Sequence, residues 1–382
     1  MADGIMKRHP EDVLIYILCK FRVKSLLRFK GVSRTWYSLV QSSTFINLHL
    51  NRTTTTRDEF IIFSRSVRKE PNGFRNVLSI LSSDNDDDLN PVFPDLDPPY
   101  LTFTEYYVYN KLVGPCNGLI ALTDFEVIVL FNPATRNYML LPPSPACPKG
   151  FRRNFRGGVG FGFDSIRNDY KFVRISELCM DSDWIPVEEQ KVEVYDLSID
   201  SWRELDHVDR QLPTVHWLPH FEIFHMGSFH WYADTDTDTM VILCFDMSTE
   251  IFRNVMMPDS CNGYDGKCYS LKILNRSLTL ICYPDPFSDS DPTQDSMVIW
   301  IMMEYGAYES WTKEYTIRPL PIEYPLTILR DHLFFLESKS GHLVCYNLTT
   351  DEVKEFNLHG YPESLRVMVY KESLTSIPKR VQ

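Results

Sequence analysis

Four histidines fall within one short stretch of the chain, and histidine is a side chain that commonly binds zinc or transfers protons near neutral pH. They are His216, His220, His225 and His230. Large aromatic residues separate them, which is typical of packed β-strands. A zinc site would need several of these side chains to converge with tetrahedral geometry. We therefore interpret the four as structural residues and predict no metal site and no cofactor.

A glycine-rich segment, Gly157–Gly162, has the composition of a phosphate-binding loop. It lacks the Gly-Lys-Ser/Thr that completes such a loop, and no helical pattern follows it that could direct a dipole at an anion. Phe161 and Phe163 alternate with the glycines, as they would on a strand. We predict a strand here and no nucleotide site.

Other catalytic patterns are weak. Cys261 and Cys268 flank a glycine-containing turn without a fixed base nearby in the sequence, and no Gly-x-Ser-x-Gly elbow occurs. Asp234, Asp236 and Asp238 are spaced like calcium ligands, but the glycine and the bidentate glutamate of an EF-hand loop are missing. Carboxylates are plentiful, so a glycosidase with paired acids stays open as an alternative. We expect a protein that is not itself an enzyme.

The composition describes the scaffold that would hold such residues. A chain of 382 residues predicts two or three domains, and 44% hydrophobic with 24% charged residues is near the globular average. Gly and Pro together number 40, which favours many turns and short strands. No signal peptide or membrane-length apolar run occurs, and the nine cysteines are scattered. We expect reduced thiols, a cytoplasmic or nuclear location, and no membrane association.

Charge is distributed unevenly along the chain. Residues 1–50 carry a net charge of +5, which leaves −17 for residues 51–382 because the whole chain is at −12. A basic head on an acidic body indicates two partners of opposite charge, although an acidic body also serves simply to keep a protein in solution. The body would repel phosphates, so we predict no nucleic-acid binding.

The basic head has the pattern of three short helices. Pro10 suits the first position of a helix, and Val13, Ile17 and Phe21 form an apolar stripe with helical spacing. Ser25 and Ser33 are candidate N-caps for a second and a third helix. A helical unit this short rarely completes a core by itself. We infer that a partner covers part of its apolar surface.

The body contains a repeated hairpin pattern. An aromatic residue is followed by Asn or Asp and, seven positions after the aromatic, by a hydrophobic residue. The four copies start at Phe131, Tyr195, Phe245 and Tyr346, and a looser copy starts at Tyr305. Their mean spacing of about 54 residues suits one four-stranded propeller blade with its loops. We predict an all-β domain that forms a β-propeller of about six blades; seven or eight blades and a stacked sandwich stay open as alternatives.

The head resembles the F-box pattern along its full length. The matching residues are Pro10–Val13, Ile17-Leu18, Val23–Lys30, Val32-Ser33, Trp36–Val40 and Phe45, with His9 where the pattern usually has leucine. The resemblance implies an F-box at residues 1–50 that docks onto a Skp-type adaptor, which in turn binds a cullin scaffold. The residues that would form or support this contact are Pro10, Val13, Ile17, Leu18, Leu26, Phe29, Val32, Trp36 and Leu39.

Residues 51–382 resemble the kelch-like, F-box-associated domain of plants. The matching segments are Gly114–Ile120, Phe131–Arg136, Gly160–Asp164 and Lys191–Asp196. Tyr370–Leu374 and the acidic body resemble the S-locus F-box proteins of pollen. That resemblance implies a substrate-recognition subunit in the pollen-tube cytosol, the pollen determinant of gametophytic self-incompatibility. Its target would be a basic, secreted style ribonuclease of non-self type, marked for ubiquitination and degradation.

Acidic loops are the candidates for binding such a target, because negative charge would steer a basic protein. They contain Asp86, Asp87, Asp88, Asp234, Asp236, Asp238, Asp289 and Asp291. Ordinary solvated loops would have the same composition. Two other functions also stay open: an F-box receptor for a different plant substrate, such as a signalling protein, and a catalytic propeller.

Overall fold

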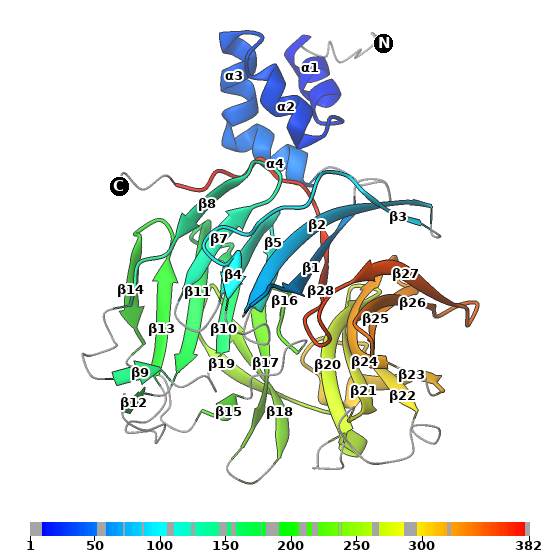
Figure 1. The fold of residues 1–382 in the computed structure, drawn as a ribbon. Helices are drawn as coiled ribbons and strands as arrows, with labels where there is room; N and C mark the ends of the chain where they lie inside the picture. Colours follow the sequence, from blue (N-terminus) through cyan, green and yellow to red (C-terminus); the bar gives the residue numbers. More distant parts are fainter. Residues whose placement is uncertain are drawn as a thin grey trace, which may run out of the picture.

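The computed structural model describes most of the chain. The described residues are 10–51, 59–71, 73–85, 88–104, 111–123, 127–144, 151–153, 158–176, 178–180, 191–205, 212–215, 221–235, 237, 239–261, 267–285, 296–318 and 322–378. Figure 1 shows a small helical unit standing on a larger, ring-shaped β domain. None of the described helices is long and apolar enough to cross a membrane.

The helical unit, which we call the head, contains four helices where the sequence predicted three. They are α1 (Pro10–Leu18), α2 (Val23–Phe29), α3 (Arg34–Gln41) and α4 (Ser43–Asn51). The Ser33 side chain caps α3 by accepting a hydrogen bond from the Trp36 amide at 3.2 Å, as predicted. The prediction for Ser25 was wrong, because α2 begins two residues earlier, after Arg22, and has no side-chain cap.

The described strands confirm a propeller of six blades. Blade one contains β28 (Arg366–Tyr370), β1 (Phe60–Arg68), β2 (Phe74–Asn85) and β3 (Asp88–Pro91), with β4 (Phe103–Thr104) beside β2. Blade two contains β5 (Lys111–Cys116), β6 (Leu119–Thr123), β7 (Ile128–Asn132) and β8 (Asn137–Leu140). Blade three contains β10 (Gly158–Asp164), β11 (Asp169–Ser176), β13 (Lys191–Asp196) and β14 (Ser201–Glu204).

The remaining three blades follow in chain order. Blade four contains β15 (Thr214–Val215), β16 (Ile223–His225), β17 (Ser228–Asp234), β18 (Met240–Asp246) and β19 (Phe252–Met256). Blade five contains β20 (Lys267–Leu274), β21 (Ser277–Pro284), β22 (Met297–Met302) and β23 (Trp311–Ile317). Blade six contains β24 (Ile322–Leu329), β25 (Leu333–Ser338), β26 (His342–Asn347) and β27 (Val353–His359). A separate ribbon pairs β9 (Phe151–Arg153) with β12 (Leu178–Met180), and two 3-10 turns cover Asp259–Cys261 and Tyr308–Ser310.

The ring is closed by the two ends of the β domain. Strand β28 pairs antiparallel with β1, from Phe60 opposite Tyr370 to Ser64 opposite Arg366. Figure 1 shows this C-terminal strand, in red, inside the first blade next to the blue strands that follow the head. Blade one is therefore assembled from segments about three hundred residues apart, which is a strongly non-local contact.

All four clear copies of the hairpin pattern form the predicted hairpins. The pattern's first and last residues lie opposite each other in Phe131–Tyr138, Tyr195–Trp202, Phe245–Phe252 and Tyr346–Val353. In three copies the Asn or Asp side chain accepts hydrogen bonds from two turn amides. In each copy the residue five places after the aromatic has a positive φ. The pattern therefore encodes a tight turn with one left-handed residue.

The looser fifth copy was placed wrongly. Trp311 pairs with Met302 and not with Tyr305, because the β22–β23 connection is longer than the other turns. Tyr305 lies in that connection, and its hydroxyl is 2.8 Å from His230 Nε2 in the neighbouring blade.

The propeller has two ends, and the head packs against one of them. Strands within a blade alternate in direction, so the turn between the third and fourth strands lies at the same end in every blade. In blade two this turn carries Ala134, which packs against the head. We call this end the head face and the opposite end the far face. In Figure 1 the β17–β18 hairpin points away from the head, toward the far face.

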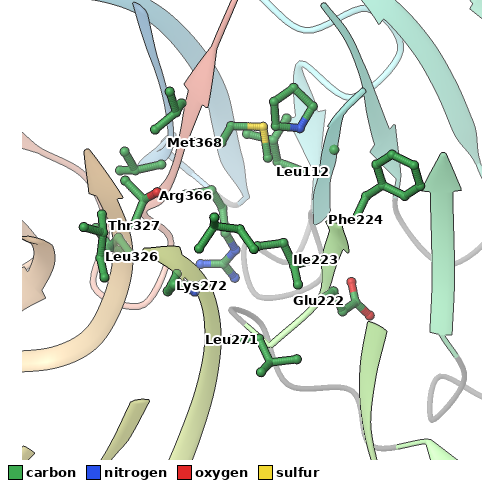
Figure 2. Close-up of a pocket in the computed structure, with 16 residues that line it drawn as sticks. Leu112, Glu222, Ile223, Phe224, Leu271, Lys272, Leu326, Thr327, Arg366 and Met368 are labelled. Carbon is green, nitrogen blue, oxygen red and sulfur yellow. The ribbon is translucent and has the colours of Figure 1, made fainter. Parts of the chain in front are cut away.

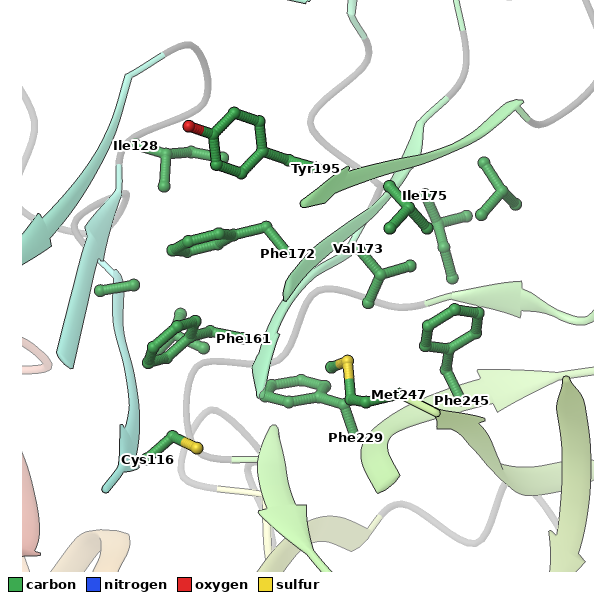
Figure 3. Close-up of a cluster of buried hydrophobic side chains, with 14 of the residues drawn as sticks. Cys116, Ile128, Phe161, Phe172, Val173, Ile175, Tyr195, Phe229, Phe245 and Met247 are labelled. Carbon is green, nitrogen blue, oxygen red and sulfur yellow. The ribbon is translucent and has the colours of Figure 1, made fainter. Parts of the chain in front are cut away.

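The glycine-rich segment is strand β10, as predicted. Its glycines are needed because the neighbouring blade packs too closely for larger side chains. A Cβ atom on Gly158, Gly160 or Gly162 would lie 2.4–2.8 Å from an aromatic side chain of blade four. These aromatics include Trp231 and Phe229, which are buried in the core between blades three and four. Figure 3 shows Phe229 of this core facing Phe161 of β10. The missing side chains let the two blades approach each other closely.

We predict that Gly160→Ala lowers the free energy of unfolding by about 1–3 kcal/mol through overpacking. The new Cβ would lie 2.8 Å from both Phe229 and Trp231. The measurement is a urea titration followed by tryptophan fluorescence. Gly31→Ala is the control, because its Cβ would meet its nearest neighbour at an ordinary 3.4 Å; its effect should stay within about 0.5 kcal/mol. Equal losses in both variants would contradict the packing argument.

Candidate functional site

The head exposes several of the apolar residues that the sequence singled out. Val13, Ile17 and Val32 are 45%, 48% and 63% exposed. Leu18 and Leu26 are buried inside the head, whereas Phe29, Trp36 and Leu39 are half-buried at its surface. The side chain of Pro10 lies outside the described residues. The structure thus divides the predicted residues into some that can touch a partner and two that support the core.

Four further large apolar side chains are exposed on the head, and the sequence did not single them out for this surface. They are Tyr16, Phe21, Tyr37 and Leu48. Together with Val13, Ile17 and Val32 we call them the head surface. So much exposed apolar area on so small a unit is typical of a protein–protein interface. The signal in the sequence was the excess of apolar residues over what a short helical unit can bury.

The head is fixed to the propeller by residues 366–378, which we call the closing segment. Leu374 of this segment is buried in the core of the head, together with Leu26 and Phe45. Glu372 is also buried, and its carboxylate accepts a hydrogen bond from the Val23 amide at 3.1 Å. Val23 is the first residue of α2, so the negative charge lies where the helix presents unpaired amides.

Two cations of the head also reach the propeller. The Arg22 guanidinium lies 5.0 Å from the centre of the Phe60 ring, and the Lys24 amine lies 4.9 Å from that of Phe93. Such cation–π contacts add modest stabilisation. Part of the positive charge of the head therefore faces the propeller rather than a partner.

The closing segment is in turn held by blade two. The Asn132 amide donates hydrogen bonds to the carbonyls of Ser373 and Thr375, at 3.0 and 2.9 Å. A Cβ on Gly118, which has φ of +75°, would lie 2.3 Å from the Ser373 side chain. The motifs Gly114–Ile120 and Phe131–Arg136 thus form the surface on which the closing segment lies, which gives them a physical role.

The candidate acidic residues do not gather at one described place. Asp88 is exposed on β3 at the head face, where its carboxylate is 3.4 Å from the Lys354 amine. Asp234 is half-buried at the end of β17, on the far face. The other six lie outside the described residues: Asp86, Asp87, Asp236, Asp238, Asp289 and Asp291. Their role in target binding stays a prediction.

The described histidine and cysteine side chains that the sequence analysis considered for catalysis are buried or half-buried. Burial lowers the pKa of His230 to about 4, and burial also lowers the pKa of His225 from its usual value. His216 and His220 lie outside the described residues. Burial raises the pKa of Cys268 to about 11, so its thiol stays protonated. Within the described part of the chain, no three His, Cys, Asp or Glu side chains are grouped to hold a metal.

Comparison with known proteins matches both parts of this chain. The F-box domain matches residues 6–48, and the F-box associated beta propeller domain matches residues 90–377. Among curated proteins, F-box protein CPR1 of Arabidopsis thaliana is 27% identical, over 96% of this chain and 88% of its own length. F-box protein At4g22390 of Arabidopsis thaliana is 25% identical, over 83% and 76% of the two chains.

Comparison with solved structures found matches of low sequence identity. TolB from Acinetobacter baumannii is 11% identical, with a TM-score of 0.48 and coverage of 86% of this chain and 70% of its own.

We predict that Asn132→Ala lowers the free energy of unfolding by about 1–3 kcal/mol more than Asn347→Ala. Both residues accept hydrogen bonds from two amides of their own turn, but only Asn132 also holds the closing segment. The two variants therefore lose the same pair of turn hydrogen bonds, and Asn132→Ala also loses the two hydrogen bonds to the closing segment. Urea titration gives the stabilities, and hydrogen exchange should speed up in residues 371–378 of the Asn132 variant alone. Equal stabilities with unchanged hydrogen exchange would contradict a stabilising role for the hydrogen bonds from Asn132 to the closing segment.

Proposed function

Because this chain belongs to the family of F-box proteins with an F-box associated beta propeller domain, we propose that it is the substrate-recognition subunit of a Skp–cullin–F-box ubiquitin ligase. The observation that carries the proposal is the head surface, which is apolar, exposed and held on the propeller by buried contacts. An adaptor of Skp type would cover this surface and link it to the cullin.

The propeller would bind the target and the ligase partners would supply the chemistry. A receptor of this kind accelerates ubiquitin transfer by proximity, since it keeps the target near the conjugating enzyme. The chain itself would then not be an enzyme. The fixed junction supports this role, because a loosely tethered propeller would hold its target at no defined position.

We propose further that the target is a basic secreted protein, with the non-self style ribonucleases of gametophytic self-incompatibility as the leading candidate. The likeness of Tyr370–Leu374 to S-locus F-box proteins and the net charge of −17 on residues 51–382 support it. The chain would then act in the cytosol of the pollen tube. The direct test is binding of purified style ribonucleases to the full chain.

A different plant substrate is the second candidate. The relatives compared above are Arabidopsis F-box proteins whose names mention neither pollen nor self-incompatibility. The adaptor contact would be the same, and only the protein held by the propeller would differ, such as a signalling protein. A cytoplasmic or nuclear location fits this candidate equally.

We predict that the double variant Ile17→Asp, Val32→Asp loses co-purification with a Skp-type adaptor. Burying unpaired charges under the adaptor should cost several kcal/mol, which corresponds to at least about 30-fold in affinity. The fold should survive, because both side chains are about half exposed or more. A charge at Leu26 would be uninformative, since that residue is fully buried in the head.

The control is Ile199→Asp, because this isoleucine is at least as exposed as Ile17 and Val32 and lies in a turn of blade three. It should bind adaptor like the unaltered chain. If the double variant still binds with an affinity within about threefold of that control, the adaptor surface has been misplaced.

We predict that binding of a basic ribonuclease weakens at least about tenfold when NaCl rises from about 50 to about 500 mM, because salt screens exposed charges. Adaptor binding, which relies on apolar contact, should change less and serves as the internal control. Surface plasmon resonance measures both on one immobilised chain. A salt-independent ribonuclease affinity would remove the electrostatic argument while leaving the receptor role in place.

A further inference from the structure

Two cysteines meet where the chain passes from blade four to blade five. Cys261 ends the 3-10 turn that follows blade four, and Cys282 lies on β21 of blade five. Both residues are 3% exposed, and their Sγ atoms are 3.0 Å apart. That distance is shorter than the ~3.5–4.0 Å at which carbon atoms make van der Waals contact, and about 1 Å longer than a disulfide bond. A small movement would therefore bring the two sulfurs to bonding distance.

Other contacts hold the turn of Cys261 against blade five. The Trp311 indole donates a hydrogen bond to the carbonyl of Met256 at 3.0 Å. The Tyr308 hydroxyl donates to the carboxylate of Asp259 at 3.4 Å. Tyr308 and Trp311 both belong to blade five, at the start of its outer strand β23. The segment from residue 256 to residue 261 is thus fixed to the next blade by hydrogen bonds that involve neither sulfur.

Two further cysteines of these blades are placed differently. Cys244 is buried in the same apolar cluster as Cys261 and Cys282, and its Sγ donates to the carbonyl of Ile242 at 3.7 Å. Cys268 lies opposite Tyr283 in the β20–β21 pair, one position along from Cys282. Because successive side chains of a strand point to opposite faces, Cys268 packs on the other side of the blade, toward blade six.

We propose that Cys261 and Cys282 are a redox modification site and form an intramolecular disulfide when the protein meets an oxidant of the peroxide class. Buried structural cysteines are usually inert, because a reactive thiol needs access to solvent. Here Asp259 and Ser260 are exposed beside Cys261, so its turn lies at the edge of the core, where local opening exposes the sulfur. Disulfides of cytosolic proteins are typically transient and redox-sensing. The site depends on neither the adaptor nor the target.

The reaction balances with hydrogen peroxide as the oxidant. The Cys261 sulfur attacks one peroxide oxygen, the O–O bond breaks, and water leaves with formation of a sulfenic acid. The Cys282 sulfur then attacks the sulfenic sulfur, the S–O bond breaks, and a second water leaves as the S–S bond forms. Two electrons pass from the thiols to the peroxide, and both thiol protons end in water.

The disulfide ties the exit of blade four to the second strand of blade five. It closes a loop of chain that contains the innermost strand of blade five, β20. A cross-link of this kind stabilises a fold mainly by restricting the unfolded chain. Oxidation therefore makes the boundary between blades four and five more resistant to unfolding, and it leaves the head surface unchanged.

The test is treatment of the full chain with hydrogen peroxide, alkylation of the remaining thiols in denaturant, and disulfide mapping by mass spectrometry. We expect a bond between Cys261 and Cys282, the loss of both from the alkylated thiols, and the recovery of both after reduction with dithiothreitol. The oxidised chain should also need a higher urea concentration to unfold. Mapping needs no variant, so absence of this bond from the oxidised chain would overturn the proposal.

Cys282→Ala should abolish the rise in the urea midpoint on oxidation, because Cys261 then lacks its disulfide partner. Cys244→Ala is the matched control, since it removes another buried thiol from the same apolar cluster. The control should form the disulfide and gain resistance to urea like the unaltered chain. If oxidised Cys282→Ala gained as much resistance as the control, the stabilisation would come from another site and the proposal would be wrong.

Discussion

The pairing of β28 with β1 is the constraint on which the rest of the molecule depends. Each of blades two to six is made of strands that follow one another closely, so each can form locally. Blade one cannot, because its innermost strand comes from the end of the chain. Once β28 is in place, the chain continues directly into Glu372 and Leu374, which enter the junction with the head. The same segment of the chain therefore closes the ring and attaches the head to the propeller.

This coupling explains why blade two carries unusually specific motifs. Its Asn132 has the turn-capping role of Asn347 in blade six, and in addition it holds the closing segment. Gly118 leaves the space that the closing segment needs. A receptor that works by proximity needs a fixed geometry between its two binding surfaces. Within the described residues, buried contacts of Glu372 and Leu374 join the head to the propeller.

The sequence predicted structure that forms between neighbouring residues, such as hairpins. It did not predict contacts between segments that lie far apart in the chain. Hairpins such as Phe131–Tyr138 were predictable because a turn type fixes the spacing of its partners. Tyr305 was misassigned because its connection is longer than that turn allows. Nothing in the composition of residues 366–378 marks them as the partner of β1 and the head. The head's fourth helix, α4, was not predicted, although Phe45 of the F-box pattern lies inside it.

Two lysines that are buried in the described part of the propeller have the same kind of sequence neighbours but different environments. Each lies on a strand among apolar residues, Lys171 on β11 and Lys272 on β20. Lys171 lies within 2.7 Å of both Asp164 and Glu250, and although burial raises it, hydrogen bonds from Lys171 help to lower the pKa of Asp164 to about 2. Lys272 instead lines a cavity of about 230 Å³ at the centre of the propeller, beside a second cation, Arg366 (Figure 2). Lys171 is neutralised by carboxylates within the fold, whereas burial and, after it, the Arg366 charge lower the pKa of Lys272 to about 7.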